Sequence, residues 1–379
     1  LRSARDSLRA AELDVRGAGS GFLPKVTGSI SKVDSNSDSI SPLTQTPDYN
    51  AALTASQNLF AGFRDRATID QARANRSVAE ANFRSARARL SFDLKSAFVA
   101  LRSADAAHAL SNDILRRRER NLRLVELRYE SGRENKGSFY LSQATLSQAR
   151  FELLQTEQAL RVAQTQLARV IGRNEPETIQ VVGEVPIAAP PVSVDFVQAV
   201  RTTPDWQRAQ AQVEAAKAGI DLAGSNFWPS LDVSGSTSRQ GGDWFPDDQR
   251  NSVALTLTVP IFNGGKDYYG TRSAGARESA AEATREGLER QVRTQLEQAY
   301  ANYVQAVAKL AVDEDFLKAA NARAEIARNK YSNGLMSFED WDLIENDLIN
   351  RQKAVLQSQR ERVTAEASWE LALGDGVIP

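Results

Sequence analysis

The feature that most constrains this chain is an internal duplication held at a constant spacing. Three segments recur 202 positions later without a net gap: Leu59-Phe60-Ala61-Gly62 as Ile261-Phe262-Asn263-Gly264, Gly132 as Gly334, and Ile171-Gly172 as Leu373-Gly374. A constant spacing indicates a repeated structural unit, because two unrelated segments of similar composition would drift out of register. Upstream, Phe22-Leu23-Pro24 matches Phe227-Trp228-Pro229 at a spacing of 205, which places the length difference in a loop.

Each repeat contains a long tract that predicts a helical hairpin. Proline is absent from residues 48–175 and again from residues 261–378. Within the first tract, Leu90, Leu94, Phe98 and Leu101 recur at three- and four-residue spacing, as on one face of a helix. Glycine at Gly132 and Gly334 can adopt the left-handed conformation that ends a helix. We therefore expect helical hairpins at about 64–172 and 266–373.

A β-hairpin is predicted ahead of each helical hairpin. In the second repeat, Leu231 and Val233, and then Val253, Leu255 and Leu257, alternate with small or polar residues. Such alternation indicates strands with one apolar face. The hairpins are expected at about 23–60, where the pattern is weaker, and at about 228–260. The fold class that follows is mainly α with a small β part, built as a tandem repeat.

The two repeats are joined by a proline-rich segment. Residues 173–193 contain Pro176, Pro186, Pro190 and Pro191 and have no helical period, so they predict an extended linker. The repeats then span 1–172 and 194–379, the second opening with helices at about 194–225 broken at Pro204. Because Leu1 aligns with Trp206, we expect the natural protein to have a segment before Leu1.

Composition excludes several classes of function. The 47 basic and 48 acidic residues nearly cancel, so nucleic acid is not an expected partner. The chain has no cysteine and a single histidine, His108, which argues against a metal site and against a catalytic triad. No cluster of acid, base and nucleophile stands out, so we expect no catalytic residues, no cofactor and no enzymatic activity.

Four strands in one chain leave open sheet edges, and these predict an oligomer. A sheet with an apolar outer face cannot keep unpaired edges in lipid. Two copies would give a barrel of about eight strands, which side chains fill, whereas three copies would give twelve strands and a hollow interior. A homotrimer is therefore expected.

The motifs together resemble the TolC family of outer-membrane efflux proteins. They are Pro260-Ile261-Phe262-Asn263-Gly264-Gly265, the Phe-x-Pro entries at Phe22 and Phe227, and the Tyr-x-x-Gly turns at Tyr129 and Tyr331. The resemblance implies a trimer with a 12-stranded β-barrel in the outer membrane of a Gram-negative bacterium, contacting its lipid, and an α-helical barrel in the periplasm. It further implies the exit duct of a tripartite efflux pump or type I secretion system, with a periplasmic adaptor protein and an inner-membrane transporter as partners.

The resemblance also places candidate site residues. Tyr129 and Gly132, with Tyr331 and Gly334, would form adaptor-facing hairpin tips; their alternative role is helix termination with a packing aromatic. Family members narrow the tunnel with acidic residues just after the second turn. Asp340 falls at a matching position, and Asp342 is one place off a second, occupied here by Leu343. Both could instead belong to a solvated helix face.

A second class of function stays open from the sequence alone. A soluble, elongated coiled-coil scaffold or adaptor could carry the same hairpins as end caps. The two hypotheses differ in the state they predict for the purified protein. A duct would be a trimer that depends on detergent or lipid, whereas a scaffold would be soluble and elongated without detergent.

Overall fold

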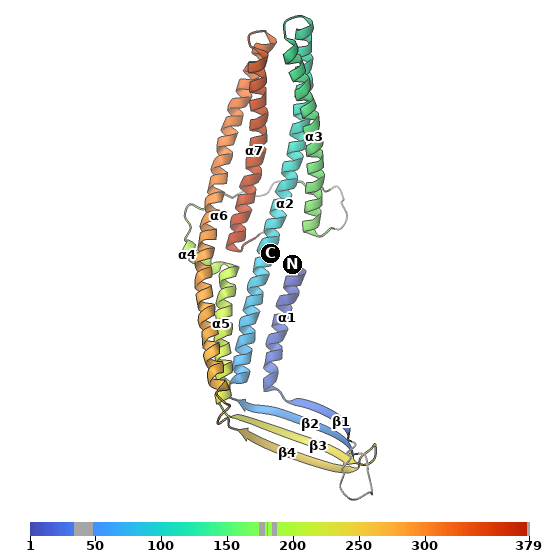
Figure 1. The fold of residues 1–379 in the computed structure, drawn as a ribbon, viewed down its shortest axis with the longest axis vertical. Coiled ribbons are helices and arrows are strands. Elements are labelled where there is room, and N and C mark those ends of the chain that lie inside the picture. Colours follow the sequence, from blue (N-terminus) through green and yellow to red (C-terminus); the bar gives the residue numbers. More distant parts are fainter. Residues whose placement is uncertain (34–47, 174–178, 180, 184–187, 377–379) are drawn as a thin grey trace. The chain divides into compact units, whose positions relative to one another are not determined.

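The computed structural model describes residues 1–33, 48–173, 179, 181–183 and 188–376. Over these residues the chain is mainly helical with one small antiparallel sheet, as the sequence predicts (Figure 1). The first repeat contains α1 (Arg2–Ala18), β1 (Lys25–Val33), β2 (Asp48–Ala61), α2 (Arg64–Glu130) and α3 (Lys136–Ile171). The second contains α4 (Phe196–Thr202), α5 (Pro204–Gly224), β3 (Ser230–Gly241), β4 (Asp248–Thr258), α6 (Lys266–Ser332) and α7 (Phe338–Leu373).

The helical hairpins of the two repeats have identical limits once the spacing of 202 is applied. The helices α2 and α6 both contain 67 residues, and α3 and α7 both contain 36. Each shorter helix ends at a glycine in the left-handed conformation, Gly172 with φ 79° and Gly374 with φ 76°. A residue with a Cβ atom would be strained there, so the same residue type stops the helix at the same place in both repeats.

The sheet has the strand order β1-β2-β3-β4, and every neighbouring pair is antiparallel. The register pairs Val26 with Ala55, Ala55 with Gly235 and Gly235 with Val253, which places these residues on one face. That face also carries exposed apolar side chains, among them Ile30 at 78% and Leu255 at 66% exposure. The edge strands are β1 and β4, one from each repeat. The polar stretch between β1 and β2 lies outside the described residues, apart from its ends.

The compact units of the fold cut across the repeats. One unit comprises residues 1–83 and 204–290, and the other comprises residues 84–203 and 291–379. Each unit therefore contains part of both repeats, because corresponding elements of the two repeats pack side by side. In the first unit, α5 lies along the start of α6, where Arg285 Nη1 donates to Gln210 Oε1 at 3.0 Å.

In the second unit the two helical hairpins pack against each other, mainly through α2 and α7. Lys95 on α2 pairs with Glu370 on α7 at 2.6 Å, and Arg117 Nη2 donates to Gln352 Oε1 at 2.6 Å. Ile114, Ala149 and Ile349 form a buried apolar cluster contributed by α2, α3 and α7. In the part of the linker that the structure describes, the carbonyl of Ala188 accepts a hydrogen bond from the hydroxyl of Tyr303 on α6 at 2.5 Å.

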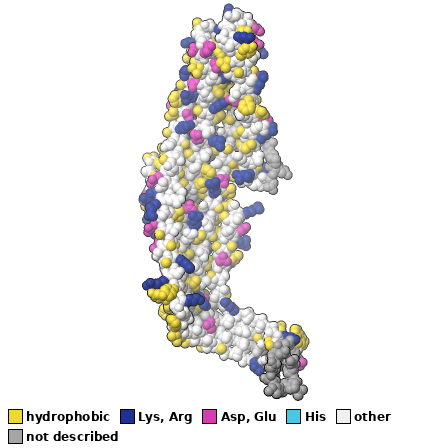
Figure 2. All heavy atoms as spheres, in the orientation of Figure 1, with side chains coloured by type: hydrophobic (Ala, Val, Ile, Leu, Met, Phe, Trp, Pro, Cys, Tyr) yellow, Lys and Arg dark blue, Asp and Glu magenta, His cyan; other side chains and the backbone are white. Residues whose placement is uncertain are grey.

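Figure 2 shows acidic and basic side chains interspersed over the helices rather than gathered by sign. Within the part of the chain that the structure describes, no helix combines the length and apolarity needed to cross a membrane.

Candidate functional site at the helical-hairpin tips

The turns at the two tips have the same backbone structure. Gly132 has φ 69° and Gly334 has φ 75°. The amide of Gly132 donates to the carbonyl of Tyr129 at 3.0 Å, and the amide of Arg133 donates to the carbonyl of Arg128 at 2.8 Å. The second tip repeats this pair of bonds, which satisfies the last free carbonyls of the long helix. The two glycines thus close both helical hairpins.

The return helices begin with side-chain caps. Asn135 accepts a hydrogen bond from the amide of Ser138 at 2.8 Å at the start of α3. Ser337 accepts from the amide of Asp340 at 3.1 Å at the start of α7, and its hydroxyl donates to Asp340 Oδ2 at 2.8 Å. Asp340 is exposed and lies in the first turn, where a carboxylate is stabilised by the helix dipole.

Tyr331 is the centre of a buried cluster at the second tip. Its side chain is 0% exposed and stacks on Trp341 with ring centroids 4.3 Å apart. Val125 of α2 belongs to the same cluster, together with Ala327 and Phe338. Tyr331 therefore does not present its ring to a partner, and its side chain holds the tip together instead.

Polar contacts join the first tip to Tyr331. The hydroxyl of Tyr331 donates to Glu134 Oε2 at 2.9 Å, and Nη1 of Arg128 donates to the carbonyl of Tyr331 at 2.9 Å. The guanidinium of Arg128 also lies over the Tyr331 ring, 4.7 Å from its centroid. Burial, followed by the hydrogen bond to Glu134 and then by the charge of that carboxylate, raises the pKa of Tyr331 well above its ordinary value, so the hydroxyl keeps its proton.

Tyr129, the repeat equivalent of Tyr331, has a different environment. It stacks on Phe139 with ring centroids 5.4 Å apart, as Tyr331 stacks on Trp341. Its side chain nevertheless remains 37% exposed, because the chain supplies no second hairpin on that side. Of the two predicted tip tyrosines, Tyr129 is the one on the surface.

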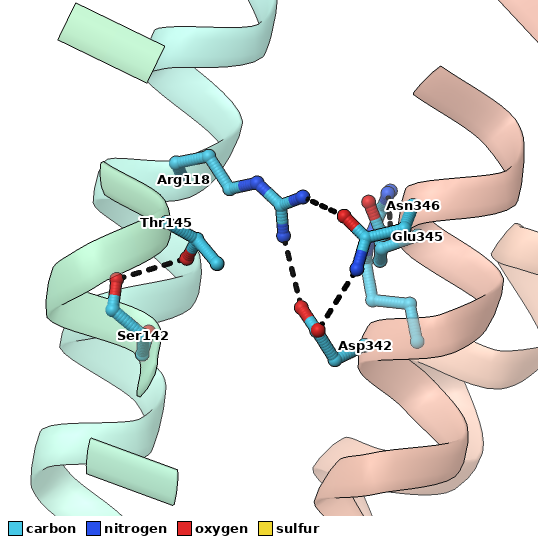
Figure 3. A network of polar contacts seen from close by, with 7 residues as sticks. Arg118, Ser142, Thr145, Asp342, Glu345 and Asn346 are labelled. Atoms are coloured by element: carbon cyan, nitrogen blue, oxygen red, sulfur yellow. Dashed lines mark hydrogen bonds and ion pairs between the residues drawn. The ribbon is translucent and has the colours of Figure 1, made fainter. Parts of the chain in front are cut away.

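Asp342 lies in a polar network between the hairpins, as Figure 3 shows. Its Oδ1 pairs with Nη1 of Arg118 at 3.1 Å, and its Oδ2 accepts from Asn346 Nδ2 at 2.9 Å. Arg118 also donates to Asn346 Oδ1. The Arg118 and Asp342 side chains are only 8% and 17% exposed. This carboxylate is neutralised within its own chain, whereas Asp340 remains open to solvent.

The sequence alone does not single out two residues that make these polar contacts, Arg118 and Glu134. Arg118 is buried and bridges to the second hairpin, which its place in the run Arg116-Arg117-Arg118 does not indicate. The covering helix α7 is more than 200 residues away in sequence, so no local pattern predicts this burial. Glu134 gave no sequence signal beyond its place in the turn. Among the described residues, no group of histidine and carboxylate side chains has the arrangement of a metal site.

Comparison with known proteins identifies the family of this fold. A family model described as outer membrane efflux protein matches residues 1–173 and 197–375. Outer membrane protein OprJ of Pseudomonas aeruginosa is 24% identical over 329 residues, 83% of this chain and 67% of that protein. Fusaric acid resistance protein FusA of Burkholderia cepacia is also 24% identical, over 73% of this chain and only 56% of its own length.

A solved structure has the same fold over nearly the whole chain. The outer membrane protein VceC of Vibrio cholerae superposes with a TM-score of 0.83 at 22% sequence identity, covering 99% of this chain and 93% of that one. The match of the family model to both repeats, including both hairpin tips, spans well over half of the sequence. The chain belongs to the outer membrane efflux protein family.

Proposed function

We propose that this protein is the outer-membrane exit duct of a tripartite efflux pump or type I secretion system, a passive conduit from periplasm to exterior. The observation that carries the proposal is the four-stranded sheet, whose register places exposed apolar residues on one continuous face while β1 and β4 remain as open edges. Family membership supports the same function, since outer membrane efflux proteins are channels rather than enzymes.

A homotrimer would satisfy both features of the sheet. Pairing β4 of one copy with β1 of the next removes all open edges, and three copies give a twelve-stranded barrel with its apolar face toward outer-membrane lipid. The edge strands have opposite directions, so this pairing would be antiparallel like the three inside the chain. The helices would continue the barrel into the periplasm.

The hairpin tips are the proposed meeting point with a periplasmic adaptor protein, which would link the duct to an inner-membrane transporter. Support comes from the exposed side chains at both turns, Tyr129 at 37% and Leu335 at 75%. Gly132 and Gly334 shape these turns, and Tyr331 supports them from inside.

Asp340 is the proposed constriction residue at the periplasmic end of the duct. Three-fold symmetry would bring three of its exposed carboxylates into a ring, and such a ring attracts cations. Asp342 is the weaker candidate, because Arg118 already pairs with it inside the chain.

The decisive experiment is to express the full-length protein and fractionate the cells. We expect the protein in the outer-membrane fraction, extracted by detergent as a species with the mass of three chains in multi-angle light scattering. A soluble, elongated monomer in the absence of detergent would contradict the proposal. It would support the scaffold hypothesis instead.

A further inference from the structure

A cleft of about 300 Å³ lies between α2, α6 and α7 in the second unit of the fold. Its α2 side is formed by one face of the helix, since Phe98, Arg102 and Ala106 follow one another at four-residue spacing. Clefts of about 300 to 1,000 Å³ commonly hold small organic ligands. The size of this cleft therefore fits a small molecule, and its lining determines which kind.

One part of the lining is apolar. Val99, Leu310 and Val363 come from the three different helices, and each is 9% exposed or less. Phe98 and Leu356 line the same cleft and are half-buried. A ligand with an apolar body would be held here by the hydrophobic effect, because it removes this surface from water.

The polar part of the lining is basic. Arg102, Arg360 and Arg362 line the cleft, and Glu314 is the only carboxylate among the described lining residues. Three positive charges and one negative charge give these side chains a net charge of +2. The side chains of Arg102 and Arg360 form no ion pair or hydrogen bond with any residue that the structure describes. The cleft therefore combines an apolar wall with positive charge that the chain does not neutralise.

Two of the arginines are partly withdrawn from water without full compensation. Arg102 is half-buried. Arg362 donates through Nη2 to the carbonyl of Ala188 at 3.4 Å, but its Nε is buried and has no hydrogen-bond partner in the described part of the chain. A buried donor or a partly buried cation without a partner costs free energy, so an acceptor with negative charge would be favoured in this cleft.

The three arginines are not part of the repeated pattern. At the spacing of 202, the equivalents of Arg102, Arg360 and Arg362 are Val304, Gln158 and Leu160. The other repeat forms helices of the same length with uncharged residues at these positions. Formation of the helices therefore does not require the positive charges.

We propose that the cleft binds an amphipathic organic anion, a molecule with an apolar body and a carboxylate head. The body lies against Val99, Leu310 and Val363. The carboxylate accepts hydrogen bonds from Arg102 and Arg360, because a guanidinium presents paired N–H donors that match the two carboxylate oxygens. The binding site does not depend on the proposed duct, since its described lining residues belong to a single chain.

Equilibrium dialysis with naphthoate, an aromatic carboxylate that can be followed by its fluorescence, tests the site. The full-length protein in a nonionic detergent fills one chamber, and the same detergent at the same concentration fills the other, so uptake by micelles cancels. We expect saturable binding of naphthoate. Naphthamide and naphthylmethylamine keep the rings but lack the negative charge, and we expect them to bind at least about tenfold more weakly.

Two variants remove the charges without changing the apolar wall. Arg102→Gln and Arg360→Gln should each weaken naphthoate binding by about fivefold or more and leave the binding of naphthamide unchanged. The matched control is Arg150→Gln, because Arg150 is an exposed arginine of α3 that also has no ion pair with a described residue. It should bind naphthoate like the wild type. Thermal denaturation checks that each variant is folded.

Several results would overturn the proposal. Equal binding of naphthoate and naphthamide would show that the arginines do not recognise the carboxylate. Displacement of naphthoate by an equal concentration of sulfate would show a site for simple anions, to which the apolar wall contributes nothing. Absence of saturable binding, or unchanged binding in both arginine variants, would show that the cleft is not the site.

Discussion

The hydroxyl of Tyr331 donates a hydrogen bond to Oε2 of Glu134 across 2.9 Å, so the buried centre of the second hairpin tip is joined to the turn of the first. Arg128 strengthens the same connection, because it donates to the Tyr331 carbonyl and covers the ring. The two tips therefore form one packed end of the helical unit rather than two independent turns.

Replacing Tyr331 with Phe isolates the contribution of this hydrogen bond. The stack on Trp341 remains, but the carboxylate of Glu134 loses a donor in a partly buried place. We expect the free energy of unfolding to fall by about 1 to 2 kcal/mol, measured by denaturant titration followed by tryptophan fluorescence. The control Tyr129→Phe, at the exposed equivalent, should change it by less than about 0.5 kcal/mol. Equal effects at both positions would argue against a special role for the contact with Glu134.

Replacing Arg118 with Ala should strongly destabilise the seam between the hairpins. The change leaves Asp342 buried without its charge partner, and loss of one member of a buried ion pair typically costs about 3 kcal/mol or more. Arg116→Ala is the matched control on the same helix, since its ion pair with Asp113 is solvent-exposed and should contribute about 0.5 kcal/mol or less. A thermal-denaturation series would compare the two, and similar losses would show that Arg118 is not held as described.

Replacing Gly334 with Ala tests the tip turn. Ala in the left-handed conformation is less stable than Gly by about 1 to 2 kcal/mol, and φ at this position is 75°. The control Gly275→Ala lies inside α6 with open space around its Cβ position, and there we expect a gain of about 0.5 to 1 kcal/mol. Opposite signs for the two variants in a chemical denaturation series would support the turn geometry. A neutral Gly334→Ala variant would count against it.

Glu366 should make stability depend on pH. Burial raises the pKa of its carboxyl above the ordinary 4.5, so the folded state binds this proton more tightly than the unfolded state. Its contribution to stability is thus fully present below pH 4.5 and is lost as the pH rises through the raised value. Glu366→Gln should remove this decline above pH 4.5 in urea titrations, whereas the exposed control Glu325→Gln should keep it. An unchanged slope in Glu366→Gln would contradict the assignment.

Asp340 is expected to control cation block of the duct. In planar bilayers, Asp340→Asn should weaken block by multivalent cations applied from the periplasmic side, because the variant removes the proposed ring of charge. Glu339→Gln, at the neighbouring exposed position in the same first turn, serves as the control. If Asp340→Asn leaves the block as in the wild type, the constriction lies elsewhere.

Much of the fold follows from local sequence patterns. Proline-free tracts, three- and four-residue apolar spacing and the glycines at 132 and 334 predict both helical hairpins, and alternation predicts the strands. The environment of the site residues is harder to predict from the sequence. Tyr129 and Tyr331 occupy the same Tyr-x-x-Gly pattern and stack on an aromatic residue ten positions later, yet one is 37% and the other 0% exposed. Part of the cover over Tyr331 comes from the other hairpin, through Val125, Arg128 and Glu134, and no local pattern predicts these contacts.

The sequence by itself determined the repeated unit, because helix periodicity, strand alternation and turn glycines act over a few residues and recur at a fixed spacing. Only the tertiary structure decided which helix faces of the two repeats pack against each other. The helices α3 and α7 have the same length and the same place in their repeats, but they differ in burial. One side of α7 packs against α2 of the other repeat, while the corresponding side of α3 is exposed to solvent. Packing between segments some 200 residues apart also determined that Arg118 is paired with Asp342 and that Asp340 is not enclosed by its own chain.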